Sequence, residues 1–219
     1  MNRTKIQWTD YSWNPVTGCK HDCPYCYARA MYHRFGTSYE PTFYEDRLDQ
    51  PCALRKPRRV FVCSVADLFG EWVPEEWIRA VLDTVRKTMH TYQFLTKNPR
   101  RYREFNPWPQ NAWLGATATN QTQWDEAATW LPLADCSIRF ISAEPLLARI
   151  DPGDWCPQWL IIGPCTGKQA QQPDPEWVCT LEQLAHAHGT PIYYEPYLLP
   201  NHPKPEFPSP GALFATNAK

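Results

Sequence analysis

Three cysteines close together near the start of the chain have the residue type and spacing of a metal-binding loop. Cys19, Cys23 and Cys26 form the pattern C-x3-C-x2-C. A loop this short can turn three thiolates toward one point, and thiolates select iron–sulfur clusters, zinc or copper(I). A structural zinc site usually takes four ligands in two separated pairs, and no partner pair stands out here. Three cysteines on a [4Fe–4S] cluster would leave one iron open to another ligand.

The cysteine loop and the residues before it resemble the radical S-adenosylmethionine superfamily. Within it, residues 7–19 are similar to small phage-type proteins of unknown function that share a three-cysteine motif. The resemblance covers about residues 4 to 198, through the segments 56–62, 64–69, 94–99, 113–115 and 142–147. It implies a [4Fe–4S] cluster on the three cysteines, with S-adenosylmethionine chelated at the open iron. It also implies an external one-electron donor and reductive cleavage to a 5′-deoxyadenosyl radical, which abstracts hydrogen from a substrate.

Length and composition indicate one globular domain in a reducing compartment. The chain has 219 residues, 43% of them hydrophobic, and a formal net charge of −1. No apolar run approaches the ~20 residues of a membrane span, and the first residues do not open a signal peptide. We therefore expect a cytoplasmic protein without membrane contact, in which the nine cysteines favour metal binding over disulfides. A second cluster on Cys156, Cys165 and Cys179 stays open, although their gaps do not resemble a compact ligand loop.

Alternating strand and helix patterns predict an α/β fold with a parallel sheet buried on both faces. Expected strands are residues 60–65, 92–96, 112–117, 138–143, 159–163 and 192–195, with another around Trp13. Expected helices are residues 74–89, 121–133 and 175–188, the last capped by Asp174 and stopped by Gly189. About six to seven β/α units suggest a partial or nearly closed TIM-type barrel over residues 1–199. Residues 200–219 form a proline-rich tail that either wraps the barrel or stays mobile.

Functional side chains in such a barrel come from the carboxyl ends of the strands and the loops that follow. The polar or small residues predicted there are Ser64, Asp67, Lys97, Thr117, Glu144, Gly163 and Glu195. Taken singly, Ser64 and Asp67 could equally cap helices, and Lys97 could be a surface lysine.

The resemblance implies roles for several of these residues and for the cysteine loop. Ser64 and Asp67 occupy the place where radical S-adenosylmethionine enzymes hold the cofactor ammonium, and Tyr25 matches the aromatic residue that packs on adenine. Lys97 is expected to pair with the cofactor carboxylate or a substrate anion. Glu144 is expected to bind ribose hydroxyls or a substrate, and Thr117 and Gly163 to line the cofactor site. Tyr27 is expected in the core and His21 on the surface.

The sequence leaves the substrate and two rival functions open. A nucleotide, a base in DNA or RNA, or a protein side chain could each be the substrate, and the phage association favours the first two. Two basic runs, residues 55–59 and 97–103, fit a polyanion, although such runs are more often a solvated face. Pro164 and Cys165 replace a glycine and a glutamate of the related pattern. The alternatives are therefore a non-catalytic zinc or iron–sulfur module, or an accessory subunit without turnover.

Overall fold

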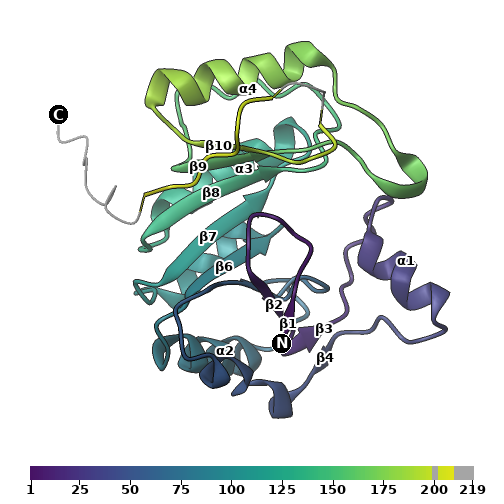
Figure 1. Ribbon diagram of the computed structural model, residues 1–219, viewed down its shortest axis with the longest axis vertical. Helices are drawn as coiled ribbons and strands as arrows, with labels where there is room; N and C mark the ends of the chain where they lie inside the picture. Colours follow the sequence, from purple (N-terminus) through teal and green to yellow (C-terminus); the bar gives the residue numbers. More distant parts are fainter. Residues whose placement is uncertain (199–201, 210–219) are drawn as a thin grey trace.

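A curved sheet of eight strands forms the centre of the protein within residues 1–198 and 202–209, which this computed structural model describes (Figure 1). The strands are β1 (Asn2–Arg3), β2 (Tyr11–Trp13), β5 (Arg59–Val62), β6 (Thr91–Thr96), β7 (Ala112–Thr117), β8 (Ile138–Ala143), β9 (Trp159–Ile162) and β10 (Ile192–Tyr194). They lie in that order across the sheet, and all neighbours are parallel except β1 and β2. Seven parallel strands in chain order confirm the predicted partial barrel.

The helices are α1 (Tyr27–Arg34), α2 (Glu75–Arg86), α3 (Gln121–Trp130) and α4 (Pro175–His188). Helix α4 has the predicted bounds: Asp174 accepts a hydrogen bond from Glu176 N at its start, and Gly189 ends it with φ 65°. Helices α2 and α3 end three residues earlier than predicted. A 3-10 turn, Leu131–Leu133, follows α3. The edge strand β1 and the small ribbon of β3 (Val16–Thr17) and β4 (Thr42–Phe43) are too short to leave a sequence pattern.

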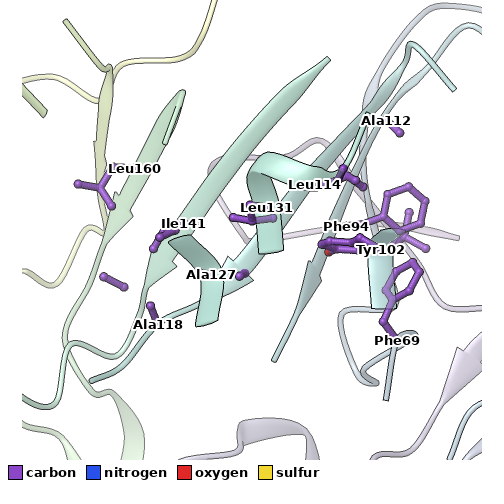
Figure 2. Close-up of a cluster of buried hydrophobic side chains, with 14 of the residues drawn as sticks. Phe69, Phe94, Tyr102, Ala112, Leu114, Ala118, Ala127, Leu131, Ile141 and Leu160 are labelled. Atoms are coloured by element: carbon purple, nitrogen blue, oxygen red, sulfur yellow. The ribbon is translucent and has the colours of Figure 1, made fainter. Parts of the chain in front are cut away.

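The outer face of the sheet packs against α2, α3 and α4 through a continuous hydrophobic core. Figure 2 shows part of this core, where side chains of β6, β7, β8 and β9 meet those of α3 and of the 3-10 segment Pro99–Phe105. The labelled members from the strands are Phe94, Ala112, Leu114, Ile141 and Leu160. Side chains along a strand alternate between the two faces of the sheet. The strand residues next to those labelled in Figure 2 therefore point to the opposite, inner face.

The inner face of the sheet is filled by aromatic rings around Trp8, which precedes β2. The Trp8 ring lies 4.7 Å from Phe61 of β5, 6.5 Å from Phe140 of β8 and 6.1 Å from Trp159 of β9. One side chain therefore touches strands from both halves of the sheet, which requires the sheet to curl. The N-terminal segment thus serves as the packing of the barrel interior.

The C-terminal segment 202–209 has no helix or strand and packs along the sheet edge. Glu206 N donates to Ile192 O (2.9 Å), and the Glu206 carbonyl accepts from Trp159 Nε1 (3.0 Å). The centre of the Phe207 ring lies 5.7 Å from that of Trp159, in a tilted arrangement, and 5.5 Å from that of Tyr193, edge to face. This part of the predicted tail lies against the barrel, and the rest, residues 200–201 and 210–219, lies outside the described residues. Across the described part of the chain, no helix has the length and apolar character needed to span a membrane.

We predict that Trp8→Ala lowers the free energy of unfolding by about 3–5 kcal/mol, because it leaves a cavity among the rings of three strands. Urea denaturation monitored by circular dichroism measures this loss. The exposed Leu133, 53% accessible, provides the control: Leu133→Ala should change stability by less than about 0.5 kcal/mol. Equal losses in the two variants would contradict the interior position of Trp8.

Candidate functional site

The cysteine loop begins at Gly18, directly after β3, and is tied to two distant segments. Gly18 N donates to Val65 O (3.2 Å), and Cys19 N donates to Tyr39 O (3.3 Å). Gly18 has φ +82°, and a Cβ there would lie 2.2 Å from the Glu40 carbonyl oxygen. Only glycine tolerates both the left-handed backbone and this close approach. The first cysteine therefore leaves the sheet edge in a fixed direction.

The end of the loop is fixed by helix α1, whose N-cap is Cys26. Its Sγ accepts a hydrogen bond from Arg29 N at 3.3 Å, which satisfies one of the free backbone donors of the first turn. The Arg29 guanidinium reaches back to the carbonyl oxygens of Cys19 (3.3 Å) and His21 (2.5 Å). One side chain thus closes the loop between its first and last cysteines.

Asp67, buried after β5, connects the cysteine loop to the barrel. Its Oδ1 accepts from Phe69 N (3.0 Å) and Thr96 Oγ1 (2.7 Å). Its Oδ2 accepts from Lys97 N and lies within hydrogen-bond distance of His21 Nε2, both at 2.9 Å. His21 is therefore half-buried and bonded, not exposed as expected. Because each oxygen already has two partners, contact between Asp67 and a cofactor ammonium would require a partner such as His21 to leave.

Lys97, at the carboxyl end of β6, points toward the cysteines. Its Nζ donates to the Tyr25 hydroxyl at 2.7 Å, which joins β6 to the cysteine loop. Burial lowers the pKa of the Lys97 amine, while the thiols of Cys23, Cys19 and Cys26 and the Asp67 carboxylate act in the opposite direction. All three cysteines thus lie within electrostatic reach of the Lys97 amine.

The donor set of the cysteine loop consists of three thiols, the ligand type that iron–sulfur clusters, zinc and copper(I) select. All three cysteines are free and partly accessible. Among the described residues, no three His, Cys, Asp or Glu side chains are close enough to hold one metal ion. A tetrahedral zinc ion needs all its sulfurs about 2.3 Å from one point, whereas the cysteines of a cluster bind different irons. Three thiols in one short loop provide the ligand type that a three-cysteine cluster needs.

Ser64 and Thr117 line the same end of the sheet without joining the Asp67 network. The Ser64 hydroxyl donates to Asn14 Oδ1 (3.2 Å), and its carbonyl accepts from the Tyr27 hydroxyl (2.5 Å). Thr117 is the last residue of β7, pairs in register with Ser142 of β8 and is half-buried. No sequence pattern points to Asn14, because its role depends on a contact across 50 positions.

Glu144, Gly163 and Glu195 meet at the ends of β8, β9 and β10. Ser142, Ile161 and Tyr193 lie side by side in the sheet and point to its inner face. Glu144, Gly163 and Glu195 each follow one of them by two residues, so all three share that face. A Cβ on Gly163 would lie 2.8 Å from Glu195 Cγ and 2.9 Å from Glu144 Cγ. The missing side chain of Gly163 is thus the space in which the two carboxyl side chains approach each other.

The two glutamates form a coupled carboxyl pair. Burial raises the pKa of Glu144 to about 8, and the charge of Glu195 and a hydrogen bond to it add to this rise. Burial also raises the pKa of Glu195 to about 7, and interactions with the Trp8 indole and the Glu144 carboxyl lower this pKa in part. Within the described part of the chain, Trp8 Nε1 is buried and has no partner in hydrogen-bond geometry. At neutral pH the pair therefore holds about one proton, and it can both donate and accept hydrogen bonds.

The remaining cysteines of the last third do not gather into a second site. Cys156 precedes β9 and lies 3.3 Å from Thr190 Oγ1, at the opposite end of the sheet from buried Cys165, which follows β9. Cys179 is exposed on α4. The structure therefore gives no support for a cluster on these three residues.

Comparison with known proteins places the chain in a family and relates its fold to solved structures. The chain belongs to the family described as "Protein of unknown function (DUF5131)", whose model matches residues 3–197. Among curated proteins, none matches the sequence.

Similar structures are those of spore photoproduct lyase. Its complex with dinucleoside spore photoproduct is 12% identical, with a TM-score of 0.54 over 84% of this chain and 62% of that chain. A tyrosine-to-phenylalanine mutant is 10% identical, with a TM-score of 0.58 over 90% and 79%. A double mutant with bound AdoMet and dinucleoside spore photoproduct is 12% identical, with a TM-score of 0.53 over 84% and 62%. The chain thus spans about 62% of the length of the first of these, and the likeness establishes the fold alone.

We predict that Asp67→Asn destabilises the protein by about 1.5–3 kcal/mol, because an amide nitrogen would face donors that the carboxylate now accepts. Thermal unfolding by differential scanning calorimetry measures the loss. Asp22, whose side chain is 95% exposed in the same region, provides the control variant Asp22→Asn. An Asp67→Asn protein as stable as this control would show that the four contacts do not hold the loop.

The carboxyl pair predicts a pH-dependent stability. Both pKa values lie above the ordinary 4.5, so the folded protein keeps protons that the unfolded chain releases. The stability from this pair is complete below about pH 4.5 and falls as pH rises through 7 and 8. Glu144→Gln should therefore be near neutral at about pH 4.5, and between pH 6 and pH 9 its stability relative to wild type should rise by at least about 1 kcal/mol, or roughly 2–4 °C in Tm.

Scanning fluorimetry from pH 5.5 to 9 tests this dependence. Glu126→Gln, on the exposed surface of α3, is the matched control and should follow the wild-type curve at every pH. A Glu144→Gln protein whose Tm difference from wild type does not change with pH would rule out proton sharing between the glutamates.

Proposed function

We propose that the chain is a radical S-adenosylmethionine enzyme that acts on a nucleotide or on a base in nucleic acid. Cys19, Cys23 and Cys26 would hold a [4Fe–4S] cluster. When bound, this group supplies the electron that cleaves S-adenosylmethionine to a 5′-deoxyadenosyl radical, the species that abstracts hydrogen from the substrate. The observation that carries the proposal is the position of a three-cysteine loop beside Lys97, to which Tyr25 of the loop is bonded, at the carboxyl end of a partial barrel.

The residues beside the cysteines have the chemistry needed to orient the cofactor. The Lys97 ammonium, held by Tyr25, can pair with the cofactor carboxylate or with a substrate anion. The Tyr25 ring is a surface for adenine, and the hydroxyls of Ser64 and Thr117 are acceptors for the cofactor ammonium and ribose. Asp67 acts chiefly by positioning, since its bond to His21 sets where the cysteine loop lies.

The carboxyl pair is assigned to recognition at the far side of the same end of the sheet. Glu144 and Glu195 share about one proton near pH 7, so together they offer an O–H donor and carboxylate acceptors. Such a pair can bind ribose hydroxyls or the mixed donor and acceptor edge of a nucleobase. Gly163 lets the backbone and both carboxyls approach a ligand closely. Water excluded from this region would strengthen each of these hydrogen bonds.

The choice of substrate class draws on the fold relatives and on the sequence resemblance. One similar structure holds AdoMet together with dinucleoside spore photoproduct, and the resemblance to small phage-type proteins points to nucleotides as well. A cytoplasmic one-electron donor would complete the reaction.

The second candidate is an accessory or metal-binding module that keeps the fold without turnover. The observation that favours it is the loop after β9, where Pro164 and buried Cys165 stand in place of a glycine and a glutamate. Cys165 N and O exchange hydrogen bonds with Gln171, so the loop has a closed local structure of its own. This candidate predicts a protein that forms no 5′-deoxyadenosine.

We predict that Cys23→Ala abolishes both iron binding and cofactor cleavage, because two thiolates cannot retain the cluster. Protein purified and reconstituted without oxygen should contain about four irons and four sulfides per chain in the wild type, and less than one in the variant. With dithionite and S-adenosylmethionine, only the wild type should release 5′-deoxyadenosine, measured by liquid chromatography and mass spectrometry.

Cys179→Ala, an exposed cysteine on α4, is the matched control and should retain both properties. Wild-type protein that binds iron and sulfide but yields no 5′-deoxyadenosine would favour the accessory module. Bound zinc in place of iron would overturn the cluster assignment.

A further inference from the structure

A surface cavity of about 220 Å³ lies at the amino ends of β5 and β6. Its walls come from two loops, within residues 52–57 before β5 and residues 87–90 before β6. Thr91 N donates to Arg58 O at 2.9 Å and joins the two loops where the strands begin. Lys97 lies six residues beyond Thr91, or about 20 Å along the strand direction. The cavity is therefore separate from both the cysteine loop and the carboxyl pair.

The cavity is lined by three cations and by no carboxylate. Arg55 and Lys56 belong to the first loop and Lys87 to the second. All three residues are exposed, and none is in an ion pair among the described residues. Arg55 and Lys56 open the basic run of residues 55–59, for which the candidate site has no use. Unpaired cations on facing loops repel one another, and an anion between them would remove this repulsion.

The main chain around the cavity has free donors and occupied acceptors. Asn111 Nδ2 donates to the carbonyl oxygens of Val85 (3.1 Å), Thr88 (3.1 Å) and His90 (2.8 Å). The side chain of Asn111 thus holds the loop before β6 in one conformation. By contrast, the N–H groups of Met89 and His90 make no hydrogen bond to any described residue. Unused N–H groups beside occupied carbonyls favour an anion over a cation.

His90 adds a buried acceptor to the wall of the cavity, and the residue is only 3% exposed. Its Nε2 lies 3.0 Å from the Pro51 carbonyl oxygen, which can only accept, so Nε2 carries the ring proton. Nδ1 of the neutral ring is then an acceptor, and it is buried without a partner among the described residues. A buried polar atom in this state is costly, and a ligand that brings a proton would satisfy it.

The size and chemistry of the cavity point to a phosphate group. At roughly 30 Å³ per water molecule the cavity has room for about seven waters, which is below the range of about 300–1,000 Å³ for drug-sized ligands. A phosphomonoester has a second pKa of about 6, so near that pH it carries both negative charge and a P–O–H group. It can accept from the cations and N–H groups and donate to His90 Nδ1. Leu54, Pro57 and Met89 provide an apolar wall for an attached carbon.

We propose that the cavity binds a phosphate group that can carry a proton, either inorganic phosphate or the terminal phosphate of a phosphomonoester such as a nucleotide. Arg55, Lys56 and Lys87 hold the charge, and His90 recognises the proton. Sulfate and the phosphodiesters of nucleic acid carry no such proton near neutral pH. The His90 acceptor therefore selects against both. This site is independent of the proposed function, because it needs neither the cluster nor S-adenosylmethionine.

Isothermal titration calorimetry with inorganic phosphate, at about pH 6 and about 50 mM salt, tests the proposal. Arg55→Gln/Lys87→Gln should weaken binding at least about tenfold, because it removes two charge-assisted hydrogen bonds. Arg34→Gln/Arg100→Gln removes two exposed cations elsewhere and is the charge-matched control. Lys97→Gln should bind phosphate like the wild type, which separates the cavity from the candidate site. A wild type that binds no phosphate, or an equal loss in the control, would overturn the proposal.

His90→Gln tests the recognition of the proton. The amide nitrogen of glutamine can replace Nε2 as the donor to Pro51, but no acceptor replaces Nδ1. The wild type should bind phosphate at least about tenfold more tightly than sulfate, and the variant should bind the two with similar affinity. Circular dichroism shows whether the variant is folded. If it is not, the wild type alone decides, since equal affinity for sulfate and phosphate would refute the proposal.

The source of the phosphate is distinguished by adenosine 5′-monophosphate, with adenosine as its control. Tighter binding of the nucleotide than of inorganic phosphate, lost in Arg55→Gln/Lys87→Gln but retained in Lys97→Gln, assigns the cavity to a phosphomonoester. Equal binding of the two assigns it to inorganic phosphate. Single-stranded DNA without terminal phosphates is the probe for phosphodiesters. If this DNA binds through Arg55 and Lys87 while neither phosphate nor the nucleotide does, the surface is a nucleic-acid contact and the proposal is wrong.

Discussion

The Asp67 carboxylate is the interaction on which the arrangement of the site depends. Two of its four partners belong to the end of β6, one to its own turn and one, His21, to the cysteine loop. A buried carboxylate without these partners would be costly, and with them it holds three segments in one geometry. The orientation of the cysteines toward Lys97 is therefore a consequence of hydrogen bonding, and metal binding would add to an arrangement already formed.

The inner face of the sheet changes character from one end to the other. Rings around Trp8 fill the interior, and the next layer toward the carboxyl ends consists of polar and small residues. The two glutamates therefore lie against an apolar layer of low dielectric constant, which disfavours their charged forms. This explains why Glu144 and Glu195 retain protons near neutral pH. Gly163 makes this possible by occupying no space between them. The barrel thus supports a binding chemistry different from that of the cysteine loop.

Helix α1 differs from the other helices because its location is dictated by the loop and not by the core. Cys26 begins it, and the Arg29 side chain reaches back over the loop. Ala28 is buried, whereas the Tyr27 ring is 58% exposed with its hydroxyl bonded to the Ser64 carbonyl, so the core position predicted for Tyr27 is wrong.

Local patterns in the sequence determined the class of fold, most strand bounds, α4 with both of its caps, and the three cysteines, because these features depend on spacing within one segment. The strand ends also identified Lys97, Glu144 and Gly163 as residues of one region. Only the tertiary structure decided that His21 is bonded to Asp67, that Tyr27 is exposed, and that Glu144 and Glu195 form a pair across Gly163. These contacts join residues 19 to 51 positions apart, and their geometry depends on the curl and register of the whole sheet. A pattern read along the chain carries no information on such distances, because the hydrogen bonds and burial that fix them exist only once the sheet has closed around Trp8.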